Sequence, residues 1–245
     1  MAALTGESLD NAVGGLTVPV TVVDLAESSV RDLNRALHSP DAARTTAWRV
    51  LNPRGAHSVA CGLAEELAVD IEGHVGYYCA GMNQRATVTV HGNAGTGVAE
   101  NMMSGTVRVH GNASQSAGAT AHGGLLVVDG DAAARCGISM KGADIVVGGN
   151  VGHMSAFMGQ AGRLVVCGDA GDALGDSLYE ARIYVKGTVK SLGADCVEKE
   201  MRDEHVTELA ELLKAAERDE DPAGFRRYGS ARRLYHFKVD NSTAY

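Results

Sequence analysis

The sequence predicts an all-β solenoid, a parallel β-helix of about seven coils that each span 19 residues. Two observations carry this prediction. A short apolar-x-apolar-x-Gly motif recurs at a fixed interval, and its apolar residues alternate with the residues between them. The motif reads VDIEG, VTVHG, VRVHG, LVVDG, IVVGG, LVVCG and IYVKG, and its closing glycines are Gly73, Gly92, Gly111, Gly130, Gly149, Gly168 and Gly187. Each glycine follows the previous one by 19 residues, without an insertion or deletion.

The alternation within each motif predicts a strand with one face toward the interior. Two columns of apolar residues, which begin at Val88 and Val90, should face the core. The position after the glycine is an Asn or Asp in five coils, and we expect a corner there because these residues tolerate left-handed backbone. A second corner is expected at the small residues Ala86, Gly105, Gly124, Ala143, Gly162 and Ala181. A βαβ arrangement is excluded because its crossover needs about 30 residues.

Both flanks of the repeat predict short capping elements. Residues 1–47 should form a small α/β cap, with a strand in 16–25 and a helix over 29–38 that begins with a capping box at Ser29. The β-helix itself should occupy residues 48–201. Residues 202–245 predict an amphipathic helix that closes the far end of the solenoid, followed by a tail of arginines and aromatic residues.

Composition excludes several functional classes. The net charge of −8 argues against general nucleic-acid binding and against an anionic membrane surface. No apolar run approaches the roughly 18 residues of a membrane span, and we expect a cytoplasmic protein because the first residues lack the features of a secretion signal. The five cysteines lack C-x-x-C pairs and local groups, so reduced thiols are expected rather than a disulfide framework, a zinc site or an iron–sulfur cluster. Cys79 and Cys136 stand three coils apart, too far for a disulfide.

The residues just before the closing glycines should form an outward row on one surface. Its first four members are Glu72, His91, His110 and Asp129. Imidazoles and carboxylates at this spacing could bind a divalent metal. We nevertheless expect a solvated polar row and no metal site, because a flat ladder rarely offers tetrahedral geometry.

A second outward row changes from polar to apolar along the rod. It comprises Asp70, Thr89, Arg108, Val127, Val146, Val165 and Tyr184. Outward valines in series should not face water, so another surface must cover them. The C-terminal helix and a partner subunit are the two candidates. The methionines and aromatic residues of the longer arc, such as Met82 and Tyr77, are expected either as packing filler or as an interface.

Motifs that carry catalysis are missing from the sequence. We find no phosphate loop, serine-nucleophile elbow, H-E-x-x-H helix or paired-carboxylate site. We therefore expect no catalytic residue and no cofactor in this chain.

The glycine-spaced strands, above all VTVHGNAGTGVAENMMSGTVRVHGNA, resemble the C-terminal GXGXG domain of the glutamate synthase large chain. The resemblance covers roughly residues 48–201 and implies a right-handed β-helix. The size and the ending FRRYGSARRLYHFKVDN look most like the free-standing version of this domain in N-methylglutamate synthase and related glutamate-synthase-like complexes. There it accompanies a class II glutamine amidotransferase-like subunit and an FMN-containing synthase subunit with iron–sulfur.

The resemblance therefore implies a non-catalytic structural subunit that scaffolds those two partners. The chain lacks an FMN barrel and clustered cysteines, and residue 2 is Ala2 where a class II glutaminase has its nucleophilic cysteine. Two alternatives are a subunit of a formylmethanofuran-dehydrogenase-type complex and an autonomous metal-dependent enzyme that uses the histidine ladder. We expect the tail residues Arg226, Arg227, Arg232, Arg233 and Tyr235 to contact partner subunits, unless the tail folds back on the rod.

Overall fold

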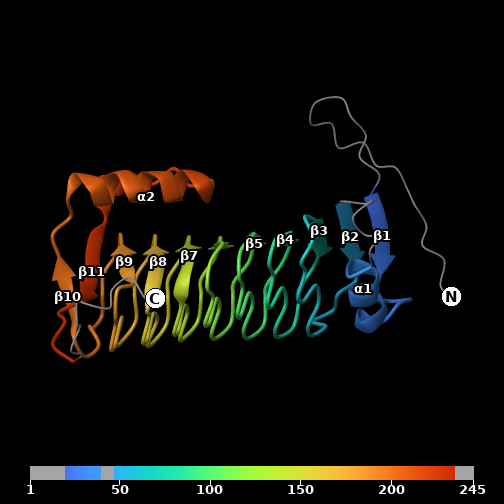
Figure 1. Cartoon of the computed structure of the whole chain (residues 1–245), viewed down its shortest axis with the longest axis horizontal. Helices are drawn as coiled ribbons and strands as arrows, with labels where there is room; N and C mark the ends of the chain where they lie inside the picture. Colours follow the sequence, from blue (N-terminus) through green and yellow to red (C-terminus); the bar gives the residue numbers. More distant parts are fainter. Residues whose placement is uncertain (1–19, 40–46, 235–245) are drawn as a thin grey trace.

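The computed structural model shows a rod of stacked strands with one helix along its side (Figure 1). It describes residues 20–39 and 47–234. Within these residues no helix is both long and apolar enough to cross a membrane. In chain order the elements are β1 (Val20–Asp24), α1 (Val30–Leu37), β2 (Ala47–Leu51), β3 (Ala68–Glu72), β4 (Thr87–Val90), β5 (Thr106–Val109), β6 (Leu125–Val128), β7 (Lys141–Val147), β8 (Ala161–Val166), β9 (Arg182–Val185), β10 (Cys196–Lys199), α2 (Asp203–Ala215), the 3₁₀ turn η2 (Pro222–Gly224) and β11 (Arg226–Ser230).

The strands from β3 to β9 confirm the predicted parallel solenoid. Strand residues pair with the residue 19 positions later, as in Val88 with Val107, except at the start of β7, where Lys141 pairs with Ala161 across a register shift. Both columns predicted to face the core are buried from β4 to β9. Because the alternation places every second side chain inward, one continuous apolar core runs along the rod.

The first strand extends the same sheet toward the N-terminus. Strand β1 pairs in parallel with β2, and β2 pairs in parallel with β3. Helix α1 lies in the connection between β1 and β2. As the capping-box spacing predicts, the hydroxyl of Ser29 accepts a hydrogen bond from the backbone N–H of Asp32 at 3.1 Å.

The Asn and Asp column works differently from the prediction. None of its five members has left-handed backbone among the described residues, so that expectation is wrong. Instead, each side-chain oxygen accepts a hydrogen bond from the backbone N–H at the equivalent position of the next coil, for example from Asn112 to Asn93 at 2.8 Å. The column therefore ties successive coils together through short polar side chains.

Residues with left-handed backbone cluster in the longer arc of each coil, the segment between the Asn and Asp column and the next strand. One coil has Gly97, Ala99 and Asn101 at φ of 72°, 56° and 56°, and these three positions recur in the following coils. Their backbone N–H groups bond alternately forward and backward, from Gly97 to Gln115 and from Ala99 to Cys79, both at 2.9 Å. These inter-coil hydrogen bonds offset a backbone conformation that L-residues disfavour.

The C-terminal helix does not close the end of the rod, and this part of the prediction is wrong. Figure 1 shows α2 running back alongside the strands rather than across the last coil. The sheet ends instead at β10, and β11 lies antiparallel between β9 and β10. The apolar face of α2 packs on apolar outward residues on the side of the rod, and this packing explains the position of the helix.

Candidate functional site

Among the described residues, the outward strand surface of the rod is polar toward the N-terminus and apolar toward the C-terminus. Toward the C-terminus, the outward residues Val127, Val146, Val165 and Tyr184 form a second core with α2 and the segment after it, through Leu209, Leu212, Leu213, Ala216 and Phe225. The four outward residues are at most 2% exposed. Of the two coverings that the sequence left open, the C-terminal helix is the one observed.

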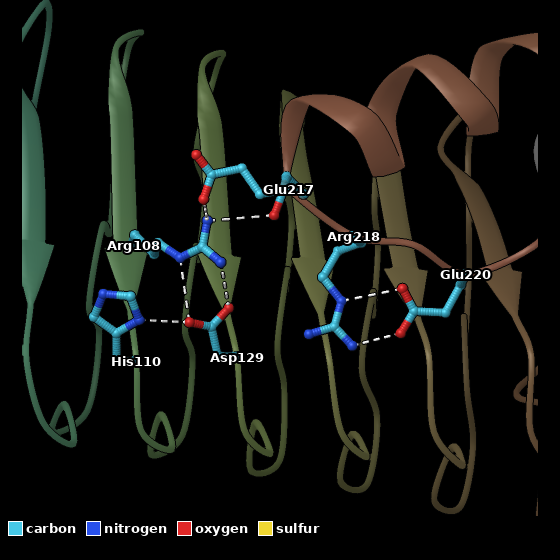
Figure 2. Close-up of polar contacts among 7 residues, drawn as sticks. Arg108, His110, Asp129, Glu217, Arg218 and Glu220 are labelled. Carbon is cyan, nitrogen blue, oxygen red and sulfur yellow. Dashed lines mark hydrogen bonds and ion pairs between the residues drawn. The ribbon is translucent and has the colours of Figure 1, made fainter. Parts of the chain in front are cut away.

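Arg108 connects the rod to the end of helix α2 (Figure 2). Its guanidinium donates two hydrogen bonds to the carboxylate of Asp129, at 2.9 and 3.2 Å. It also donates to the carboxylate of Glu217 at 2.7 Å and to the carbonyl oxygen of Ala216 at 3.3 Å. Ala216 is the C-cap of α2, so a cation meets the negative end of the helix dipole. The arrangement holds the helix end on the rod.

A second ion pair lies just beyond the helix, between Arg218 and Glu220 (Figure 2). The hydrogen bond from Arg218 lowers the pKa of the Glu220 carboxyl below its ordinary value, so it stays ionised. Arg218 lies over Gly148, where a Cβ atom would come within 2.8 Å of its Nη1. The same Cβ would come still closer to the backbone carbonyl oxygen of Asp129, so both the preceding coil and the arginine leave room only for a glycine here.

The beginning of α2 is held by a third polar contact. The hydroxyl of Tyr184 donates a hydrogen bond to Glu208 at 2.7 Å, and Arg182 and Arg163 both face the same carboxylate. Burial, together with this hydrogen bond, raises the pKa of the Tyr184 phenol, which remains protonated. Helix α2 is thus fixed at both ends by charged groups from the rod.

The predicted ladder of Glu72, His91, His110 and Asp129 lies in one row, but only His110 and Asp129 form a polar contact with each other, while Glu72 and His91 contact residues outside the ladder. The two imidazole rings have centroids 5.1 Å apart. His110 contacts Asp129 at 2.7 Å, while His91 contacts Asp70 at 3.2 Å and Glu72 lies 3.6 Å from Arg49. Within residues 20–39 and 47–234, no group of three His, Cys, Asp or Glu residues could hold a metal ion.

The cysteines are free thiols, and their surroundings oppose ionisation. Burial raises the pKa of Cys61 and Cys167 to about 11 and that of Cys136 and Cys196 to about 12. Burial also raises the pKa of Cys79. Since the thiolate is the nucleophile and the metal ligand, none of the five is prepared for either role.

The arginines predicted to contact partners lie in or beside the last strand. Arg226 and Arg227 belong to β11, and their side chains donate to the carbonyl oxygens of Gly187 and Glu200. Arg232 donates to Glu180 at 2.8 Å, and Arg233 is exposed. Residues 226–230 therefore fold into the sheet, as the second reading of the tail expected. Tyr235 lies outside the described residues, and partner contact by any of the five remains a prediction.

Some residues of the longer arc are available for contact. Met102 and Met140 are buried in the core, as packing filler would be. By contrast Tyr77, Met82 and Met103 are 45–55% exposed, and Tyr77 stacks on His57 with ring centroids 3.6 Å apart. Packing is thus observed for part of this group, and an interface role for the exposed members remains a prediction.

The sequence reasoning did not assign a role to Arg108, Glu208, Glu217, Arg218 or Glu220. The only available signal was the position of Arg108 at the point where its row turns apolar. Arg108, Glu208 and Glu217 join the helix to the rod, whereas Arg218 and Glu220 pair with each other just beyond it.

Comparison with known proteins finds a relative that matches most of the chain. No family model matches the sequence. The chain is similar to "Protein GlxC" from Rhizobium meliloti (strain 1021), with 64% identity over 226 residues. The matched region covers 91% of this chain and 99% of that protein.

Proposed function

Because this chain belongs to the family of Protein GlxC, whose full length it matches, we propose that it serves as a structural subunit of a glutamate-synthase-like complex. The observation that carries the proposal is a stiff solenoid whose polar clusters secure its own helix. The glycine-spaced repeat resembles the corresponding domain of the glutamate synthase large chain, which supports the choice of complex.

More specifically, we propose a complex of the N-methylglutamate synthase type. One partner would be a class II glutamine amidotransferase-like subunit, and the other an FMN-containing synthase subunit with iron–sulfur. The cysteines of this chain do not fit an iron–sulfur cluster, because they are dispersed and their thiols are held protonated. The redox groups would therefore belong to the partner.

The physical contribution of the rod would be to hold the two partner subunits in fixed positions. Hydrogen bonds join neighbouring coils at three places: between the strands, at the Asn and Asp column and in the longer arc. The coils therefore cannot move independently. A rigid element can keep two active sites at a fixed separation, which matters when a labile intermediate such as ammonia passes between them. We place the docking contacts at the exposed Arg226 and Arg233, near the end of the rod.

Affinity purification of the tagged full chain from its native host, followed by native mass spectrometry and flavin analysis, tests this proposal. We expect an assembly that contains an FMN-bearing subunit and a glutamine amidotransferase-like subunit. Recovery of the chain alone under mild conditions would contradict it. Molybdenum or tungsten in place of FMN would indicate the formylmethanofuran-dehydrogenase type.

A variant pair tests the docking contacts separately. Arg226→Ala combined with Arg233→Ala should weaken retention of the partners, because arginine is frequent at the energetic centre of interfaces. Arg85→Ala, an exposed arginine in the middle of the rod, is the control and should retain them. Equal retention by all variants would remove the docking assignment while leaving the complex itself intact.

A further inference from the structure

A cavity of about 320 Å³ lies where β10 and β11 meet the start of helix α2. Its volume falls at the lower end of the range for small-molecule sites. The charged side chains of its lining are strongly biased toward one sign: five cations, Arg182, Lys199, Arg202, Arg227 and Arg232, against the single carboxylate of Glu180. The rest of the lining includes Tyr179, Ser230 and His205.

Two of these cations stand directly opposite each other in the sheet. Lys199 of β10 and Arg227 of β11 are partners in the antiparallel register. Side chains at directly opposite positions lie on the same face, and both of these line the cavity. Like charges in such a pair destabilise a sheet unless an anion lies between them.

The nearby carboxylates mostly neutralise the other arginines. Arg232 pairs with Glu180, Arg182 with Glu208, and Arg202 with Glu200 and Glu204. Glu208 also faces Arg163.

Lys199 and Arg227 are different, because no carboxylate among the described residues lies within ion-pair distance of either side chain. Desolvation, followed by the charges of Arg182 and Arg202, lowers the pKa of Arg227 below its ordinary value. Desolvation and the charge of Arg227 likewise lower the pKa of His205. Positive charge is therefore in local excess on this wall of the cavity.

We propose that this cavity binds a small anion with a carboxylate or phosphate group, held between Lys199 and Arg227. Guanidinium and ammonium groups both donate to the oxygens of such anions, and the guanidinium can do so through two parallel hydrogen bonds. A volume of about 320 Å³ favours a small molecule over a segment of a partner protein. The site is independent of the proposed role in a complex, since every group that forms it belongs to this chain.

Titration of the full chain with sodium phosphate and with sodium succinate, at constant ionic strength, tests the site. Binding is measured by isothermal calorimetry and by the midpoint of thermal unfolding. The test variant is Lys199→Gln combined with Arg227→Gln. The matched control, Lys141→Gln combined with Arg85→Gln, removes the same two residue types from exposed positions of the rod.

We expect saturable binding of at least one anion to the wild type and to the control. The test variant should bind at least tenfold more weakly and, without anion, should unfold at a temperature no lower than the wild type, because repulsion is removed. The tighter anion shows whether the site is built for carboxylate or for phosphate. Lys199→Gln alone provides the same comparison if the double variant does not fold.

Three outcomes would overturn the proposal. One is the absence of saturable binding of either anion to the wild type. Another is equal binding by the wild type, the test variant and the control, which would indicate a general ionic effect. The third is binding of an acidic peptide such as oligoglutamate but of neither small anion, which would make the cavity a protein-docking site.

Discussion

The two halves of the rod share one coil pattern, and one outward column shows most clearly how they differ. In the N-terminal half the column reads Arg49, Asp70, Thr89 and Arg108, and in the C-terminal half Val127, Val146, Val165 and Tyr184. The first group is partly exposed, whereas the second is buried beneath helix α2. At this column the strand register is the same in both halves from β3 to β9, with steps of 19 residues.

This difference shows that different columns of one repeat have different roles: some build the coil, and one determines what the surface contacts. The inward columns and the inter-coil hydrogen bonds build the coil, and they are the same throughout the rod. The outward column is free to vary, so it decides what each surface binds. Arg108 stands at the boundary, with Asp129 beside it and Glu217 at the end of the helix. It lets the apolar half end in a satisfied polar contact instead of an exposed edge.

The largest effect should follow from placing a charge under the helix. Val146→Asp buries a carboxylate with no partner in an apolar interface, and we expect the free energy of unfolding to fall by about 3 kcal/mol or more. Thr89→Asp is the control, since Thr89 occupies the same column three coils earlier and is partly exposed. Its effect should stay within about 0.5 kcal/mol. Urea denaturation measures both, and equal losses would mean that the two halves do not differ.

A smaller effect should follow from a cavity on the helix side of the same interface. Leu213 is 1% exposed, and Leu213→Ala should lower the free energy of unfolding by about 2–3 kcal/mol. Cleavage of α2 in limited proteolysis should also become faster. The exposed Glu211 lies on the same helix, so Glu211→Ala is the control and should change little. If Leu213→Ala were as stable as the control, the helix would not be held by its apolar face.

Much of the fold could be predicted because it depends on local pattern. The interval between glycines determined the coil, and the run of outward valines indicated that this face is covered. The position of α2 could not be derived in the same way, because helical periodicity defines an apolar face but does not say which surface it meets. Strand β11 was missed because RRYGS shows no apolar alternation.

The polar contacts around the helix were beyond sequence reasoning for a different reason. Arg108 and Glu217 are separated by 109 positions, and no repeat relates them. The Asn and Asp column was recognised, but its chemistry was misread. Asn and Asp are favoured at a corner for either of two reasons: they tolerate left-handed backbone, and they carry a short side-chain acceptor. The residue type is the same in both cases, so only the structure shows which reason applies.

Removing the boundary arginine should have an intermediate effect. Arg108→Gln deprives Asp129 and Glu217 of their common partner and the helix end of its cation, so we expect a loss of about 1–2 kcal/mol. Arg49 is in the same column of the uncovered half, where its contact with Glu72 is longer, at 3.6 Å. Arg49→Gln should therefore cost less than about 0.5 kcal/mol. Urea denaturation of the two variants decides the point, and an equal loss would deny Arg108 any special role at the boundary.

The smallest effect concerns pH at the edge of the covered half. The pKa of Glu220 lies below its ordinary value of 4.5 because Arg218 donates hydrogen bonds to the ionised carboxylate. A depressed carboxyl pKa stabilises the folded state above the unfolded value, and this stabilisation is lost as the pH falls through the folded value.

Glu220→Gln should therefore be less stable than the wild type by about 0.5–1 kcal/mol at pH 7, and the difference should shrink toward zero as the pH falls below 4.5. Urea denaturation between pH 3 and 7 measures this, with the exposed Glu211→Gln as the control. A difference that stayed constant with pH would show that Glu220 acts through packing alone. The helix would then be secured beyond its last turn by shape, and the charged boundary of the covered half would rest on Arg108.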